Sequence, residues 1–359
     1  MVNITINSTS ITATDPQADL TALVNLLNKT ISQYGLGLIW FIGNLGSIFN
    51  CIVFSQPAYG KSPCAMYFIA SSVAQFFTFN FALFTRMLQF GYSVNAINVY
   101  LYYCKFRYYF FYVFVAIPRY YIIMASIDRY FASSRNALRR QYSSPKIALR
   151  LIIGTVIFWC IIYIQVLVFY EINNGSCSYR PGSYGIFFSA YISIDSGALP
   201  LLLMLIFGLL TVRNIHLTKK RIDAAPTTNA GQAKKDGKMS KKDVQLHRML
   251  ANQIILFIIL NLPNPCYLIY SSVTINVAKS TFRKATETFV SNMTYVLIYF
   301  GFSLTFANFF VSSDMFRREF FQVIRTKILG GAATPSVATA QTTVAVTTIR
   351  GPRQNDGAD

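Results

Sequence analysis

The residues most able to do chemistry are ionisable side chains placed inside long apolar stretches. Arg119 lies near the middle of one such stretch, and Asp195 lies within another. Charged groups are costly in an apolar medium and usually have a function there, so we expect these two side chains to form an ion pair. The alternative is that each lines a hydrated cavity separately. Gln75 and Asn261 are further polar residues within apolar stretches.

A second group of charges stands at the end of the stretch that contains Arg119. The sequence there is Asp128-Arg129-Tyr130, in which a carboxylate and a guanidinium are adjacent and able to pair. The simpler interpretation is that these charges only anchor the end of a helix at a membrane surface.

These residues belong to a chain that is too apolar for an ordinary soluble protein. Of its 359 residues, 53% are hydrophobic and only 13% are charged, against about 25% in a typical soluble domain. The apolar residues form seven blocks, each long enough to cross a membrane as a helix. The blocks span about 35–55, 64–90, 102–130, 151–170, 185–212, 249–275 and 288–313.

We therefore predict an all-α membrane protein, with a bundle of seven transmembrane helices over residues 34–313. Cations then alternate with aromatic residues such as Phe316 and Phe320. This alternation predicts a short amphipathic eighth helix over 314–329 on the membrane surface. The composition of residues 330–359 predicts a disordered cytoplasmic tail.

The distribution of charge predicts the orientation of the chain. Lys and Arg are concentrated in the connections after the third and fifth blocks and after the seventh, and they are scarce in the alternate connections. Retention of cations on the cytoplasmic side then places the N-terminus outside the cell and the C-terminus inside. The same bias explains the net charge of +19, so a nucleic-acid partner is not expected.

Glycosylation signals agree with this orientation. The predicted extracellular tail, residues 1–33, carries acceptor sequons at Asn3, Asn7 and Asn28, and Asn174 lies in a predicted outer loop. We expect these four asparagines to be glycosylated.

The Asp128-Arg129-Tyr130 sequence, at the inner end of the third of seven spans, resembles the rhodopsin-like (class A) G-protein-coupled receptor family. Further matches are the Gly43-Asn44 element, Trp159, and the prolines Pro200 and Pro263. The resemblance covers about residues 35–329, and its pattern is most similar to invertebrate orphan and FMRFamide-type peptide receptors. It implies a plasma-membrane receptor in which Asp128, Arg129 and Tyr130 couple to a heterotrimeric G protein.

The resemblance also implies a disulfide. Cys104 has the family's spacing from Asp128-Arg129-Tyr130, and Cys177 lies in the second outer loop, where an oxidised pair is permitted. The alternative is that both cysteines are unpaired and only pack.

Three positions depart from the family pattern. Gln75 replaces the sodium-binding aspartate, Asn261 replaces the tryptophan before the sixth-helix proline, and the seventh span has Asn308-Phe309 without the usual proline and tyrosine. Sodium modulation and the details of activation are therefore open.

The resemblance constrains the extracellular ligand mainly by exclusion. Phe111 occupies the position of the amine-binding aspartate, and Tyr299 that of the retinal-binding lysine. The predicted outer vestibule instead has cations and aromatic residues, which favours a peptide with acidic and aromatic groups. The alternative is that the cations reach the lipid head groups. The candidate ligand-pocket residues are Arg86, Arg107, Tyr108, Phe111, Tyr112, Tyr295 and Tyr299, with Lys105 nearby.

Other functions have weaker support. The chain has no phosphate loop or hydrolase motif, and its two histidines, His216 and His247, lie in a predicted cytoplasmic loop. We expect no enzymatic activity, no cofactor and no metal. A small-solute transporter or channel is the main alternative, because Arg119 and Asp195 could mark a solute path. A scaffolding receptor without a ligand is a third possibility.

Overall fold

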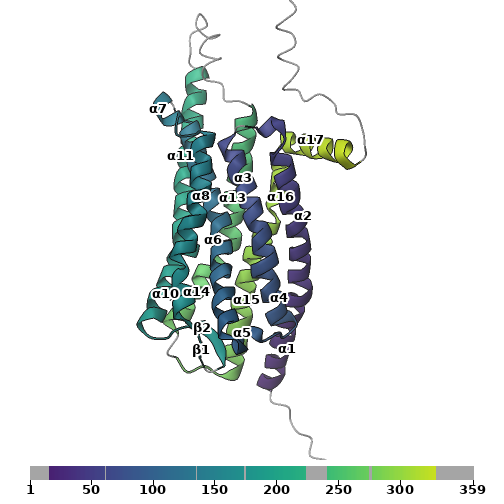
Figure 1. The fold of residues 1–359 in the computed structure, drawn as a ribbon, viewed down its shortest axis with the longest axis vertical. Coiled ribbons are helices and arrows are strands. Elements are labelled where there is room, and N and C mark those ends of the chain that lie inside the picture. Colours follow the sequence, from purple (N-terminus) through teal and green to yellow (C-terminus); the bar gives the residue numbers. More distant parts are fainter. Residues whose placement is uncertain are drawn as a thin grey trace, which may run out of the picture.

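The computed structural model describes residues 16–60, 62–134, 136–173, 175–223, 241–274 and 277–328. Within them, six uninterrupted or gently bent helical segments are long and apolar enough to span a membrane. A seventh span is formed by two helices that meet at a bend of 40°. The predicted all-α bundle of seven membrane-spanning helices is therefore confirmed (Figure 1).

Each span is built from one or more consecutive helical elements. The first three spans are α1 (Pro16–Thr30), η1 (Ile31–Gly35) and α2 (Leu36–Phe54); α3 (Pro63–Phe77), η3 (Thr78–Leu83) and α4 (Phe84–Gly91); and α6 (Leu101–Ala132). The fourth and fifth are α8 (Pro145–Ile162) with α9 (Ile164–Phe169), and α10 (Ser183–Ser193) with η4 (Ile194–Ala198) and α11 (Leu199–Asp223). The sixth and seventh are α13 (Lys241–Asn261) with α14 (Pro263–Val273), and α15 (Thr281–Ser303) with α16 (Thr305–Ser312).

Shorter elements join and flank the spans. They are η2 (Pro57–Tyr59), α5 (Ala96–Val99), α7 (Ala137–Arg140), the antiparallel strands β1 (Tyr170–Asn173) and β2 (Ser176–Tyr179), α17 (Asp314–Val323) and η5 (Ile324–Ile328). The hairpin and α5 lie at one end of the bundle, and α7 and α17 lie at the other (Figure 1). We call these the hairpin end and the Arg129 end, after the residues placed there below.

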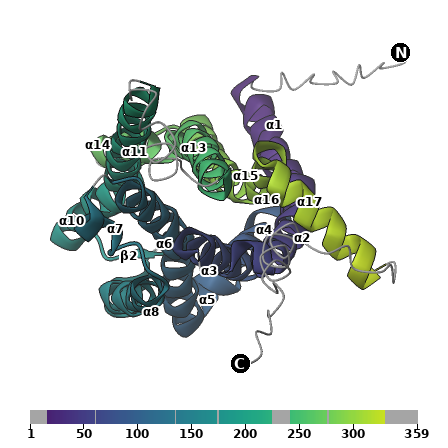
Figure 2. The same ribbon diagram turned by 90° about the horizontal axis from the view of Figure 1, so that it is seen from above.

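The third span is the central element of the bundle. Helix α6 contacts α3, α8, α11 and α13, and Figure 2 shows it surrounded by other helices. Its burial is correspondingly high: 72% of its most apolar 18-residue stretch is buried inside the protein, against 22% for the fourth span. Polar residues on α6 therefore face other helices, whereas large apolar side chains such as Ile153 and Leu209 are exposed on the outside of the bundle, where lipid would cover them.

Helix α17, continued by η5 to residue 328, matches the amphipathic helix predicted over 314–329. It lies across the Arg129 end of the bundle (Figure 1). Phe316 is fully buried and packs against Phe54 and Phe309, with ring centroids 5.3 and 6.0 Å away. Its apolar face is therefore fixed to the bundle by aromatic contacts.

The structure differs from the sequence-based description in two places. The first span begins at Pro16 rather than near residue 35, because α1 continues into α2 through η1 without leaving the helical conformation. Residues 16–33 thus form a helix that packs on α15, although their polar composition indicated only a tail. The hairpin of β1 and β2 was not predicted either. The predicted tail 330–359 and the start of the N-terminal tail lie outside the described residues.

Candidate coupling site and central cavity

The last turns of α6 place Asp128 and Arg129 side by side, and both side chains are 5% exposed. The Nη2 atom of Arg129 donates to Oδ2 of Asp128 over 2.6 Å, and its Nε donates to the same oxygen over 3.1 Å. Ser143 donates its hydroxyl to Oδ1 of Asp128 over 2.6 Å. The carboxylate therefore has partners on both oxygens, which fixes its orientation toward the arginine.

Arg129 has a second acidic partner on another span. Its Nη1 donates to Oδ1 of Asp243 over 2.8 Å, so one guanidinium joins α6 to α13. Asp243 is more accessible, with 39% of its side chain exposed. Sequence analysis did not identify Asp243, although it directly follows Lys241 and Lys242 at the start of the sixth span. An acidic residue next to cations at a helix end was the available signal.

A polar crevice with a volume of about 350 Å³ lies beside Arg129 and is open to solvent. Its lining includes Arg129 and Asp243, the cations Arg140 and Lys242, and Ser62 and Ser143. Tyr130, the third residue of the motif, turns the other way: its ring packs against Phe207 of α11 at 5.8 Å, and its hydroxyl accepts from Arg139. At this end the ion pair between α6 and α13 therefore lies at the edge of a crevice, with Asp243 as its more exposed partner.

Amide side chains hold the sixth and seventh spans together in the half nearer Arg129. Asn308 of α16 donates to the backbone oxygen of Met249 over 3.2 Å and to Oε1 of Gln253 over 2.9 Å. Its own oxygen accepts from Ser312, and Asn252 donates to Ser312 over 2.7 Å. The seventh span thus replaces the usual proline and tyrosine with a set of hydrogen bonds to α13.

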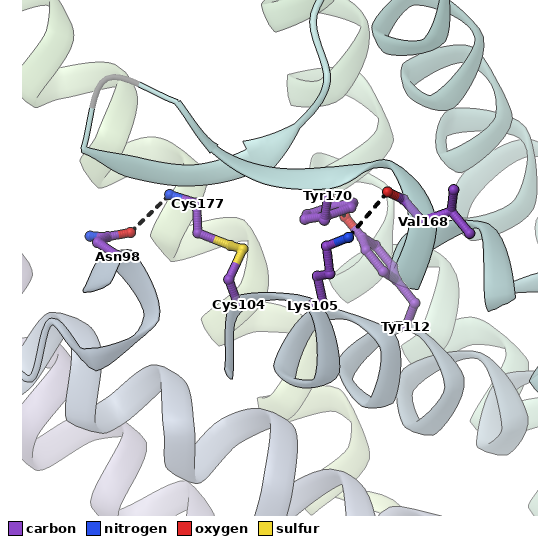
Figure 3. The surroundings of a disulfide bond; sticks show 7 residues. All are labelled: Asn98, Cys104, Lys105, Tyr112, Val168, Tyr170 and Cys177. Atoms are coloured by element: carbon purple, nitrogen blue, oxygen red, sulfur yellow. Dashed lines mark hydrogen bonds between the residues drawn. A yellow bond between two sulfur atoms is a disulfide. The ribbon is translucent and has the colours of Figure 1, made fainter. Parts of the chain in front are cut away.

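At the hairpin end, the disulfide between Cys104 and Cys177 is formed, which confirms its prediction (Figure 3). It joins the start of α6 to β2, with 5.8 Å between the Cα atoms. Asn98 accepts from the backbone N–H of Cys177 over 3.0 Å, and Lys105 donates to the backbone oxygen of Val168 over 3.3 Å. These bonds fix the hairpin over the end of the bundle.

The two outer arginines point into the bundle instead of reaching the head groups. Arg86 is 8% exposed, donates to Asn292 over 2.8 Å, and lies 4.0 Å from the ring centre of Tyr295. Arg107 is 2% exposed and donates to Thr85 over 3.2 Å. The snorkelling alternative is therefore wrong for both. Lys105 is half-buried and donates to Val168 in α9, at the end of the fourth span.

The remaining candidate pocket residues form an aromatic cluster below the hairpin. Tyr108 packs on Tyr170 of β1 at 4.7 Å, and the hydroxyls of Tyr112 and Tyr170 are 2.8 Å apart (Figure 3). Phe111 meets Tyr295 at 5.7 Å. Tyr299 is fully buried nearby, with no partner for its hydroxyl among the described residues.

The expected ion pair between Arg119 and Asp195 is wrong. Asp195 accepts from the hydroxyl of Tyr120 over 2.7 Å and from that of Tyr163 over 2.5 Å, so two neutral donors satisfy its two oxygens. Arg119 is 2% exposed and forms no hydrogen bond or ion pair within the part of the chain that the structure describes. Its guanidinium lies over the ring of Phe257, with 5.9 Å between Cζ and the ring centre.

The two other polar residues that the sequence analysis placed within spans, Gln75 and Asn261, are also buried. Gln75 is 1% exposed and donates to Ser71 of the same helix over 3.3 Å. Asn261 is 5% exposed, and its Oδ1 has no partner among the described residues. Of the predicted glycosylation sites, Asn28 accepts from Asn292 over 2.7 Å, while Asn3, Asn7 and Asn174 lie outside the described residues.

A small cavity lies between the aromatic cluster and Arg119. Its lining includes Phe111, Tyr112, Arg119, Tyr163 and Tyr295. The cavity has a volume of about 20 Å³, which is enough for one water molecule. In this conformation the centre of the bundle is therefore nearly closed.

Residues 46–308 match the model of the seven-transmembrane receptor family of the rhodopsin type. Since this match covers well over half of the chain, and the bundle and the disulfide agree with it, the protein belongs to the rhodopsin-like G-protein-coupled receptor family. A search of curated proteins finds no match to the chain.

Proposed function

We propose that this receptor binds an extracellular peptide at the hairpin end and activates a heterotrimeric G protein at the Arg129 end. The observation that carries the proposal is that Arg129 forms two ion pairs. One buried guanidinium pairs with Asp128 of its own helix and with Asp243 of α13, beside a crevice open to solvent. The proposal places the Arg129 end in the cytoplasm and the glycosylated N-terminus outside the cell.

The two ion pairs suggest how coupling is controlled. When α13 moves away from α6, the bond to Asp243 breaks first, because that partner sits on the moving element. Arg129 is then free to meet an incoming segment of the G protein. A ligand drives this change only if it binds the open state more tightly than the closed one. The amide bonds between α13 and α16 oppose the same movement.

The outer half of the bundle favours a peptide ligand. Arg86 and Arg107 are held among tyrosines, so acidic and aromatic groups would find both charge and ring partners there. The resemblance to FMRFamide-type receptors supports the same class, a neuropeptide. Transport of a small solute is less well supported, because the family match favours a receptor and the centre of the bundle admits little more than one water.

A peptide-library screen tests the proposal. The receptor is expressed with a promiscuous G protein, and calcium release is recorded for each peptide. We expect at least one acidic, aromatic peptide to give a saturable response that is lost in the Arg129→Ala variant at equal surface expression. A response of equal size in parent and variant would exclude coupling through Arg129.

A further inference from the structure

Arg119 is a buried cation that has no hydrogen-bonding partner among the residues the structure describes. It is 2% exposed, and its Nε atom has no acceptor among the described residues. A charge placed in this way near the middle of a membrane protein is strongly unfavourable unless an opposite charge meets it.

Among the residues that the structure describes, no acidic side chain forms an ion pair with Arg119. Asp195 was the expected partner, but it forms no ion pair with Arg119 and accepts from the hydroxyls of Tyr120 and Tyr163 instead. Tyr163 also lines the cavity beside Arg119, whereas Asp195 does not. Phe257 offers only the face of a ring at 5.9 Å.

The cavity beside Arg119 has the composition of an anion site. Among the described residues that line it, Arg119 is the only charged one and none is acidic. Ser196 and Asn264 add a hydroxyl and an amide to the walls, and the remaining walls are mostly aromatic or aliphatic. Its volume suits a single small group.

We propose that this cavity binds a small monovalent anion on Arg119. The anion is either a free ion such as chloride or a carboxylate carried by the ligand. The carboxylate case rests on the proposed receptor function, whereas the free-ion case does not. In both cases the anion supplies the acceptor that Asp195 does not provide, and it links the outer cavity to the contact between Arg119 and Phe257 of the moving sixth span.

Thermal unfolding of the purified full-length receptor tests this site without ligand or G protein. The melting temperature is measured in sodium gluconate, and the gluconate is replaced stepwise by chloride in one series and by formate in another, at constant ionic strength. Binding to the folded state alone raises the melting temperature, and we expect a saturable rise of about 2–4 °C in the parent.

Three variants assign any such rise. Arg119→Gln removes the charge and should abolish the rise, and Arg119→Lys keeps a charge and should retain a rise that needs a higher anion concentration. Lys146→Gln removes an exposed cation of α8 and should show the same rise as the parent. If Arg119→Gln does not fold, the changed half-saturation of Arg119→Lys decides the question.

The outcomes separate the two sources of the anion. A rise with chloride identifies a free ion, and a rise with formate alone identifies a carboxylate of the ligand. No rise in either series, or a rise of equal size in Arg119→Gln and the parent, would overturn the proposal. Since coupling is not measured, neither result depends on whether the receptor activates a G protein.

Discussion

At the scale of single residues, the buried charges of this receptor are satisfied in unequal ways. Asp128 and Arg129 have charged partners, Asp195 has two tyrosine hydroxyls, and Arg119 has no hydrogen-bonding partner in the described chain. Hydrogen bonds to a charged group are stronger than those between neutral groups. The two bonds to Asp195 should therefore contribute more to stability than other tyrosine bonds in the same helix.

Adjacent tyrosines of α6 allow this comparison. Tyr120 donates to the Asp195 carboxylate and Tyr121 to the backbone oxygen of Ile152 over 3.0 Å. We expect Tyr120→Phe to lower the free energy of unfolding by about 1.5–3 kcal/mol and Tyr121→Phe by about 0.5–1.5 kcal/mol. Thermal melting of the purified variants measures the difference. Equal losses of unfolding free energy in the two variants would show that the charge of Asp195 does not strengthen its hydrogen bond with Tyr120.

The sequence predicted which residues would be buried polar groups, but it did not predict their partners. Arg119 and Asp195 were correctly placed within spans, and their pairing was wrong because the two tyrosines also reach the aspartate. Which hydroxyl faces which carboxylate depends on the rotation of α6 and on the π-helical turn η4 that carries Asp195. Neither the rotation nor the turn can be read from hydropathy.

At the scale of elements, the contact between the sixth and seventh spans replaces a missing family motif. Asn308 was recognised in the sequence only as part of a departure from the family pattern. Its partner Ser312 lies one turn further along the same helix. Its partner Gln253 could not be predicted, because the position of α16 against α13 depends on the bend of 40° between α15 and α16. The structure shows that polar side chains, and no proline, fix the position of α16 against α13.

A double-mutant cycle measures this contact. Asn308→Ala and Gln253→Ala are made singly and together, and we expect a coupling of about 0.6 kcal/mol in the unfolding free energy, the usual size for a hydrogen bond between membrane helices. Thr155→Ala on α8, whose hydroxyl bonds within its own helix, should combine additively with Asn308→Ala. Additivity in both cycles would mean that the amide bond does not hold α13 to α16.

At the scale of the whole molecule, the number of spans followed from block length and composition. These signals succeed because every backbone polar group in lipid must be satisfied internally, which leaves the helix as the only local solution. The hairpin and the helical start of the first span were missed, because both lie where water can reach the chain and that constraint no longer applies. The direction of the chain across the membrane is still a prediction from the loops.

Epitope tags at the two ends test that direction. A tag before Met1 should bind antibody on intact cells, and a tag after Asp359 should bind only after permeabilisation, because the cation-rich connections are retained inside. Treatment with peptide N-glycosidase should increase the mobility of the parent, and Asn3→Gln with Asn7→Gln should reduce that change. Staining of the C-terminal tag on intact cells would reverse the orientation.

The central claim is that the ion pair between Arg129 and Asp243 keeps α13 against α6, and that Arg129 is needed for coupling. Ligand-independent nucleotide exchange on purified heterotrimeric G proteins, measured with membranes of equal receptor content, tests it most directly. Loss of a partly exposed ion pair of about 1 kcal/mol predicts about a fivefold higher basal rate for Asp243→Asn. Arg129→Ala should show no receptor-dependent exchange, and the exposed control Lys146→Gln should equal the parent. An unchanged rate in Asp243→Asn together with normal exchange in Arg129→Ala would contradict the account.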